Sequence, residues 1–267
     1  VACAEGGTNL AGDTSTPCEA TFLTGYGAHV MAEGTDATLR AAGVELLRVG
    51  QTNVVGRYPL HMHMMGEAGG ARSYAHDCSV HQSYYRGVAI HGTHNATLAH
   101  TTAYDIIGHC FYLEDGVEEN NTLAYNFAAH VHFLGASSYS TSFTGQWASD
   151  VAQTTSLMQP ADIIASGYYI PNLYNNIIGN AASGGWAGFA FPIMTKPTGV
   201  VEATGDEDAQ VTPQSRPALR FDGNSAHSSG YWWEKGGAMY FGGELWEEDG
   251  AYVYNAGRKT AARDTCT

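Results

Sequence analysis

The chain has few positive charges. Of its 267 residues, 12 are Lys or Arg and 26 are Asp or Glu, which gives a formal net charge of −14. Nucleic acids and anionic membranes are bound through basic patches, so this balance argues against both as partners. It also disfavours unaided binding of an acidic polysaccharide. Charged residues make up 14% of the chain, against roughly 25% in ordinary soluble domains, so long charged helices are not expected.

Long apolar runs are also lacking. No stretch approaches the roughly 18 apolar residues of a transmembrane helix, so no membrane span is expected in this segment. The chain begins Val-Ala-Cys, with neither an initiator methionine nor a signal-peptide pattern, which favours a mature or partial segment of a secreted or surface protein. No pattern indicates an organic cofactor. Among five cysteines, Cys3 and Cys18 are the candidates for a disulfide, which favours an oxidising compartment.

Glycine and tyrosine are abundant, at 33 and 16 residues, and short runs of β-forming residues recur. Thr97–His100 (TLAH) is echoed by Thr122–Tyr125 (TLAY), 25 residues later, and Ile178–Ser183 is echoed by Asp222–Ser228. A period in the twenties with short strands, turn residues and no amphipathic helix per unit indicates an all-β parallel β-helix.

The expected organisation is a Gly/Ser/Thr-rich N-terminal loop or cap, one β-helix domain with long inserted loops, and a short C-terminal tail. The domain boundaries are predicted at residues 1–27, 28–262 and 263–267, and the inserted loops at 135–161 and 192–217. Loops of that length inserted between the strands of a regular coil often contain functional residues.

Side-chain alternation along the strands predicts which residues face the coil interior and which face outward. The residues predicted to face inward are Leu60, Met62, Met64, Val88, Ile90, Phe111 and Leu113. The residues predicted to face outward are His61, His63, His91, Cys110, Tyr112 and Glu114.

Three successive coils then place His63 or His61, His91 and Glu114 in one outward column. Neighbouring strands lie about 4.8 Å apart, so these groups can converge on one ion or one sugar. The His61-x-His63 spacing puts two imidazoles on one side of a strand, as transition-metal sites require. The metal candidates are therefore His61, His63, His91 and Glu114. His130-x-His132 has the same spacing with fewer candidate ligands around it.

The acids beside this column are candidates for general acid and base. Glu114 and Asp115 are adjacent, so they face opposite sides of a regular strand unless a bend at Gly116 turns Asp115 toward the same cleft. Glycoside cleavage needs two carboxyl groups about 5 to 10 Å apart. Glu114 can also pair with Asp105, Glu118 or Glu119, although Glu118 and Glu119 are expected in a solvated turn.

Two sequons, at Asn95 and Asn120, are candidate N-glycosylation sites and fit an extracellular or cell-surface location.

Three motifs, GRYPLHMHMMG, SVHQSYYRGVAIHGTHN and YDIIGHCFYLEDGVEENNT, resemble the hallmark run of a known family. It contains the secreted cell migration-inducing hyaluronan-binding protein and its transmembrane hyaluronidase paralogue. The resemblance continues through Asn175–Ala182 and Arg220–Ser228. It implies a single-stranded right-handed parallel β-helix, an extracellular location and, for some members, calcium-dependent endo-type depolymerisation of hyaluronan. Fibrocystin-like relatives have no established catalysis.

The functional hypothesis is cation-dependent cleavage of a polysaccharide. Glu114 or Asp115 serves as acid/base, His109 orients the acids, and the substrate is bound by Arg57, His91 and Tyr112. A divalent cation, calcium by the resemblance or a zinc-like metal from the histidines, would bridge an acidic protein to a uronate.

Two alternatives remain open. The chain can be a non-catalytic building block that assembles with other extracellular proteins. It can also be a lyase in which a cation neutralises a uronate and Tyr112 or a histidine removes the proton.

Overall fold

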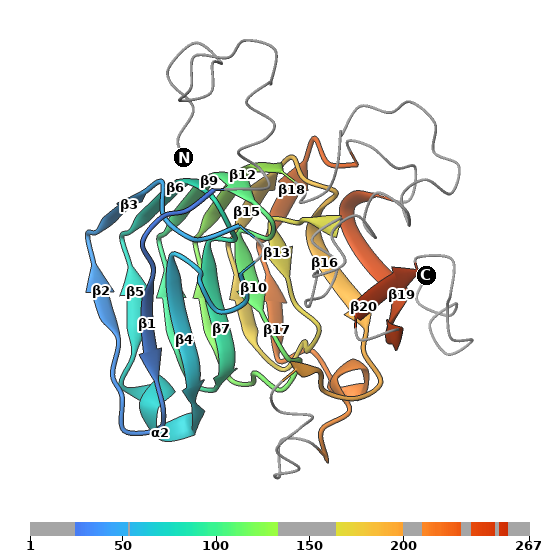
Figure 1. The fold of residues 1–267 in the computed structure, drawn as a ribbon. Coiled ribbons are helices and arrows are strands. Elements are labelled where there is room, and N and C mark those ends of the chain that lie inside the picture. The colour runs from blue at the N-terminus through green and yellow to red at the C-terminus, as the bar shows by residue number, and fades with distance from the viewer. Residues whose placement is uncertain are drawn as a thin grey trace.

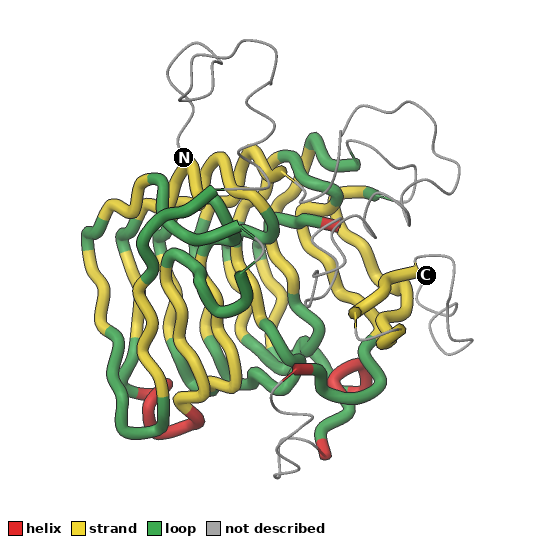
Figure 2. The backbone as a smooth tube through the Cα atoms, viewed as in Figure 1, coloured by secondary structure: helices red, strands yellow, loops and turns green. Residues whose placement is uncertain are grey.

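The computed structural model describes residues 25–52, 54–132, 164–199, 210–230, 236–248 and 251–255. Most regular structure in these residues is β, and the backbone winds from strand to strand in successive coils about one axis (Figure 2). Helical structure includes α2 (Gly66–Ala71) and the 3-10 turn η4 (Pro213–Ser215). In the described part, no helix has the length and apolar character needed to cross a bilayer.

The strands form three sheets that run side by side along the molecule (Figure 1). The first sheet has the order β1-β4-β7-β10-β13-β16-β19-β20. Its strands are β1 (Val30–Glu33), β4 (Leu60–Met65), β7 (Val88–Thr93), β10 (Phe111–Leu113), β13 (Tyr168–Tyr169), β16 (Ala187–Ile193), β19 (Gly237–Glu248) and β20 (Ala251–Asn255). All its pairs are parallel except β19 with β20.

The other two sheets are parallel throughout and contain three-residue strands for the most part. The second sheet comprises β2 (Arg40–Ala42), β5 (Tyr74–His76), β8 (Thr97–Ala99), β11 (Thr122–Ala124), β14 (Asn176–Ile178) and β17 (Arg220–Asp222). The third comprises β3 (Glu45–Leu47), β6 (Ser79–Ser83), β9 (Thr102–Ile107), β12 (Phe127–His132), β15 (Ala181–Ser183) and β18 (Ser225–His227).

From β1 to β18, each coil contributes one strand to each sheet, which defines a parallel β-helix and confirms the predicted architecture. The segments that repeat in the sequence are the strands that stack on one another in neighbouring coils. Thr97–Ala99 lies in register on Thr122–Ala124, and Ala181–Ser183 lies in register on Ser225–His227.

The corner between the second and third sheets is held by stacked polar residues. His100, Tyr125 and Gly179 occupy successive coils there, with positive φ of 49°, 57° and 62°. Each turns the chain sharply through a left-handed conformation, which glycine adopts without steric cost. The following residue on the inner coils is asparagine, and the buried side chains of Asn126 and Asn180 hydrogen-bond from coil to coil.

The interior is a continuous apolar core. Leu60, Met62, Val88, Ile90, Phe111 and Leu113 belong to it, as alternation predicts. Two predicted orientations are wrong. Met65 lies in the core in place of Met64, because Met64 has a positive φ of 50° that interrupts the alternation. Cys110 is also in the core, because it precedes β10 and the period of two holds only inside a strand.

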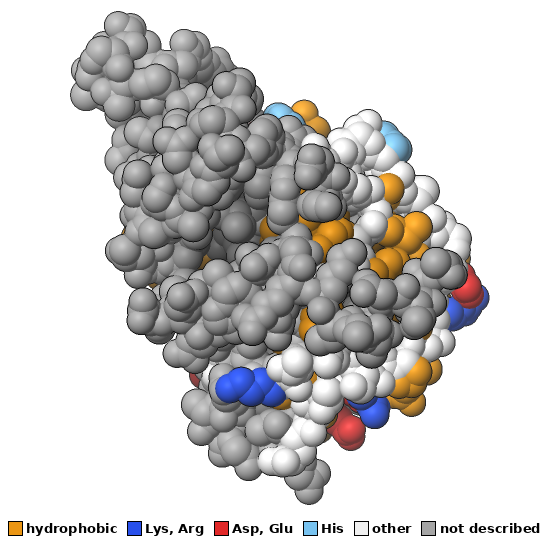
Figure 3. All heavy atoms as spheres, turned by 90° about the vertical axis from the view of Figure 1, so that its right-hand side faces the viewer, with side chains coloured by type: hydrophobic (Ala, Val, Ile, Leu, Met, Phe, Trp, Pro, Cys, Tyr) orange, Lys and Arg blue, Asp and Glu red, His pale blue; other side chains and the backbone are white. Residues whose placement is uncertain are grey.

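At the β19 end of the molecule, hydrophobic side chains lie among polar ones and few charged side chains are visible (Figure 3). Met239 and Phe241 on β19 are 47% and 52% exposed. Cys78 and Cys110 are free thiols. Cys3, Cys18 and the predicted loop at 135–161 lie outside the described residues, as do most of the N-terminal cap and all of the C-terminal tail.

Candidate functional site

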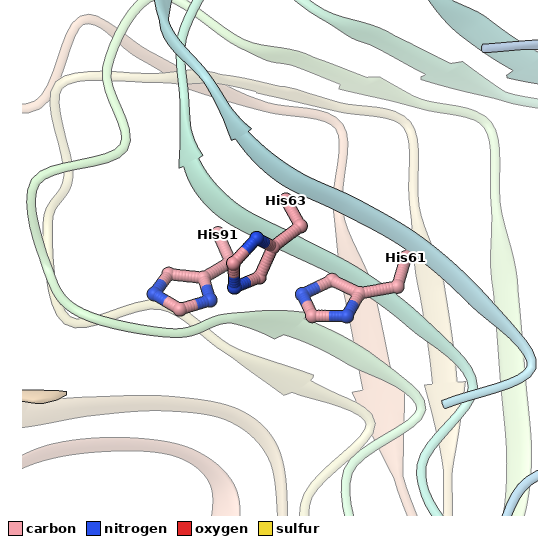
Figure 4. Close-up of side chains that lie close together, drawn as sticks. All are labelled: His61, His63 and His91. Atoms are coloured by element: carbon pink, nitrogen blue, oxygen red, sulfur yellow. The ribbon is translucent and has the colours of Figure 1, made fainter. Parts of the chain in front are cut away.

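Three histidines from two adjacent strands meet on the outer side of the first sheet. His63 on β4 lies in register with His91 on β7, and their ring centroids are 4.7 Å apart. His61, two residues before His63, stacks on His91 at 5.7 Å with nearly parallel planes. The three imidazoles point toward one another (Figure 4). Strand register therefore produces the cluster directly from the HxH spacing.

Glu114 completes this column from the next coil. Its backbone N–H donates to the carbonyl of Ile90, so the residue lies beside His91. Its Oε2 is 3.4 Å from His91 Nδ1 and 3.7 Å from His61 Nε2. Its Oε1 accepts a hydrogen bond of 3.1 Å from the Tyr58 hydroxyl. Glu114 thus faces two of the histidines with one oxygen and is anchored through the other.

The far nitrogens of two histidines are held by hydrogen bonds. His61 Nδ1 lies 3.1 Å from the carbonyl oxygen of Gly56, and a carbonyl only accepts, so Nδ1 carries the hydrogen. Nε2 is then left as a lone pair facing Glu114. His91 Nε2 lies 2.8 Å from Asp115 Oδ2, which leaves His91 Nδ1 facing the cluster. Such outer contacts fix the orientation of metal-binding histidines.

Asp115 reaches this site because the chain bends at Gly116. Gly116 has a φ of +84°, and a Cβ there would lie 2.4 Å from the Met194 sulfur, so the position requires glycine. The bend lets Glu114 and Asp115, which would face opposite sides of a straight strand, contact the two nitrogens of one imidazole.

Glu118 is not the solvated turn residue that the sequence predicts. It is fully buried and accepts hydrogen bonds from the backbone N–H groups of Gly92, Asp115 and Gly116. The Glu118 side chain turns inward because its carboxylate is the acceptor for three buried backbone N–H groups that water does not reach. Glu119 is largely buried as well, in an ion pair with Arg216.

Burial and charge give the histidines different proton affinities. Burial lowers the pKa of His61 to about 4, so its ring is uncharged at neutral pH. Burial also lowers the pKa of His63. Burial alone would lower that of His91, but the charge of Glu114 and the hydrogen bond to Asp115 outweigh it and raise this pKa to about 10. In the absence of an ion, this pKa gives the His91 ring a second proton at neutral pH, between the carboxylates of Glu114 and Asp115.

Four buried atoms in the cluster have no hydrogen-bond partner. They are His61 Nε2, His63 Nδ1, His91 Nδ1 and Glu114 Oε2. Nitrogen atoms of the three histidines that can serve as ligands lie within 4.8 Å of one another. Glu114 Oε2 lies 3.7 Å and 3.4 Å from the His61 and His91 nitrogens, whereas His63 Nδ1 lies 3.6 Å from Glu33 Oε1. Buried polar atoms are normally paired, so these atoms fit a bound ion that would pair with them. Three imidazoles and a carboxylate suit zinc-type metals, whereas calcium takes six to eight oxygens and does not fit this set.

The match to known families agrees with the motifs. The family model for the CEMIP beta-helix matches residues 25–232. The chain belongs to the CEMIP beta-helix family. Two Dictyostelium discoideum proteins, a G8 domain-containing protein and Protein rliB, are 47% and 46% identical over 87% and 90% of this chain. Human Fibrocystin-L is 32% identical over 73% of it. The chain spans 20% of the length of each Dictyostelium relative and 4% of Fibrocystin-L.

Of the remaining predicted site residues of this CEMIP beta-helix, His109 and Tyr112 pack beside Tyr58, which contacts Glu114, and Arg57 lies apart. Arg57 is exposed and its guanidinium lies 2.8 Å from His29 Nε2. His109 is buried, stacks on Tyr112 and accepts a hydrogen bond from the Ser166 N–H. Tyr112 is fully buried on the outer side of the first sheet. Their predicted roles stay predictions.

Sequence reasoning gave no role to two residues in contact with these groups. Tyr58 holds Glu114, and the buried guanidinium of Arg86 lies 3.6 Å from the centroid of the Tyr112 ring. Tyr58 stands three residues before the HxH motif, outside the strand, so period-two alternation has no bearing on it.

The sequon asparagines Asn95 and Asn120 are exposed in turns of neighbouring coils, with positive φ of 63° and 57°. Exposure is what an acceptor site needs, and glycosylation at both positions stays a prediction.

Glu118 should make the stability of this CEMIP beta-helix depend on pH. Burial, with the nearby charge of Asp115, raises the pKa of Glu118 from 4.5 to about 7. Between these values the folded protein binds more protons than the unfolded chain, so the free energy of unfolding falls as pH rises toward 7. In Glu118→Gln, Tm should therefore fall less steeply than in the wild type between pH 5 and 8.

The comparison uses slopes, because glutamine replaces one carboxylate oxygen that accepts from backbone N–H groups and so lowers Tm at every pH. The exposed Glu67→Gln is the control and should follow the wild-type profile. Parallel profiles for Glu118→Gln and wild type would show that Glu118 does not titrate in this range.

Proposed function

We propose that the chain is a metal-binding β-helix module that acts on a glycan outside the cell. The ion is of the zinc type and is held by His61, His63, His91 and Glu114. The observation that carries this proposal is the meeting of His61, His63 and His91, whose ligand nitrogens lie within 4.8 Å of one another, with Glu114 Oε2 3.4 Å from His91 Nδ1. The outer contacts of His61 with Gly56 and of His91 with Asp115 support it, because they direct the inner nitrogens at the cluster.

The reaction we assign is cleavage of a glycosidic bond. A bound zinc-type ion supplies Lewis-acid polarisation of an oxygen and lowers the pKa of bound water. Asp115 holds the His91 ring in position, and Tyr58 holds Glu114. The glycan assignment rests on the resemblance to hyaluronan-depolymerising relatives. The net charge of −14 supports a need for a cation between this chain and an acidic polysaccharide.

Metal analysis of the purified protein, paired with assays of reducing-end release on acidic and neutral polysaccharides, tests the proposal. The expected result is one tightly bound ion at this site and release that stops with a chelator and returns with Zn²⁺. Full activity in metal-free protein would overturn the metal assignment. Absence of new reducing ends on every polysaccharide would overturn the catalytic one.

Glu114→Gln separates two roles at one atom, since Oε2 can bind the ion or exchange a proton. If Glu114 is a ligand, the variant should bind the ion at least about tenfold more weakly. If Glu114 is the acid/base, the variant should keep the ion and lose cleavage. A variant that retains both the ion and full activity would remove Glu114 from the site altogether.

A second candidate function is structural, and burial favours it. The side chains of His61, His91 and Glu114 are between 0% and 4% exposed. Four protein ligands close a tetrahedral zinc site, as in structural centres, whereas catalytic centres keep a position open. A closed site predicts a chelator-sensitive Tm with no depolymerisation. Thermal unfolding with and without a chelator, beside the reducing-end assay, distinguishes the two functions.

A further inference from the structure

A second group of metal-ligating side chains lies on the third sheet, away from the strands that carry the first cluster. Asp105 projects from β9, and His130 and His132 project from β12. One ligand atom from each of the three residues lies within 4.8 Å of the other two. The HxH spacing recurs here, and the adjacent coil supplies the carboxylate.

Strand register creates this group. Tyr104 pairs with Ala129 and Ile106 with Val131, so Asp105 lies opposite His130. Val131 faces the core, which leaves the histidines on either side of it to face outward. Both approach the same carboxylate oxygen, Asp105 Oδ1, with His132 Nε2 at 2.6 Å and His130 Nδ1 at 3.5 Å.

The group is open to solvent, unlike the first cluster. The side chains of Asp105, His130 and His132 are 31%, 56% and 27% exposed. A hydrated ion can therefore reach them without any movement of the chain. Two imidazoles and a carboxylate are donors that zinc-type ions prefer, and water can fill the remaining position.

A similar trio shows that composition alone does not produce this arrangement. His76, Asp77 and His100 also meet across neighbouring coils and are also exposed. There, His76 Nδ1 approaches Asp77 Oδ2 at 2.7 Å, whereas His100 Nδ1 approaches Oδ1 at 3.4 Å. The two histidines contact different oxygens, so the trio offers an ion no common point.

We propose that Asp105, His130 and His132 form a second, solvent-open site for a zinc-type divalent ion. The ion takes the place of the proton that joins His132 to Asp105, and water completes its coordination. With three protein ligands, the site keeps a position for a donor atom from outside the chain.

Equilibrium dialysis of the whole chain against Zn²⁺ tests the proposal. Wild-type protein should bind two equivalents. His130→Gln and Asp105→Asn should each weaken one of them at least about tenfold. The matched controls His76→Gln and His100→Gln should keep both. His61→Gln should remove the Zn²⁺ equivalent bound at the first cluster, so loss of binding at one site can be told from loss of binding at the other.

The proposal is overturned if His130→Gln binds Zn²⁺ as His76→Gln does, or if Asp105→Asn keeps the full second equivalent. The substituted side chains are partly exposed, so the variants should fold, and an unchanged Tm in metal-free buffer verifies this. Co²⁺ absorption gives a second readout, because d–d bands that report nitrogen ligands should diminish in His132→Gln but persist in His76→Gln.

Discussion

Replacing His61 by glutamine should weaken Zn²⁺ binding at the first cluster by at least about 100-fold. His61 is fully buried, and its Nδ1 contact with Gly56 directs the Nε2 lone pair at the cluster. The low pKa of this ring, about 4, means that no proton competes for Nε2 at neutral pH. Loss of an outer-shell contact alone weakens metal binding 10- to 100-fold, so loss of a ligand should weaken it further.

Two further variants calibrate that result. Asp115→Asn leaves all four ligands in place and changes the partner of His91 Nε2, so it should weaken binding roughly 10- to 100-fold. His227→Gln changes an exposed histidine whose ring contacts Ser228, and it should have no effect. Zn²⁺ titration against a competing chelator measures all three. If His61→Gln binds as tightly as His227→Gln, the first cluster is not a metal site.

The column of His63, His91 and Glu114 could be predicted because it depends on two regular features. Alternation within a strand decides which residues face outward, and the spacing between coils decides which of them stack. Both features are visible in the sequence as short apolar runs repeated at intervals in the twenties. Core residues such as Val88 and Leu113 follow from the same two features.

The corners could not be predicted in this way. Their conformation depends on single residues with positive φ, such as Tyr125, whose side chain gives no sign of it. The inward fold of Glu118 depends on three backbone donors supplied by two coils. Asp115 joins the site through the bend at Gly116, which the sequence marks as a bend without giving its direction. The catalytic hypothesis depended most on these turns.

Asn180→Ala should lower the free energy of unfolding by at least about 3 kcal/mol, because its buried amide serves both neighbouring coils. Its Nδ2 donates to the carbonyl of Leu123 and to Asn224 Oδ1. Its Oδ1 accepts from the backbone N–H and the side chain of Asn126. Each buried group left unpaired costs about 1 to 3 kcal/mol, and alanine restores none of the four bonds.

The control comes from the start of β14 on the same coil. Asn176 is half buried and its amide makes one long contact, 3.5 Å, with the Thr122 hydroxyl, so Asn176→Ala should cost less than about 1 kcal/mol. Urea unfolding of both variants measures the difference. Equal losses would mean that the repeat of IGNAAS (Ile178–Ser183) as DGNSAHS (Asp222–Ser228) reflects stacked turns alone. A loss confined to Asn180→Ala would mean that the repeated asparagine holds those turns in register.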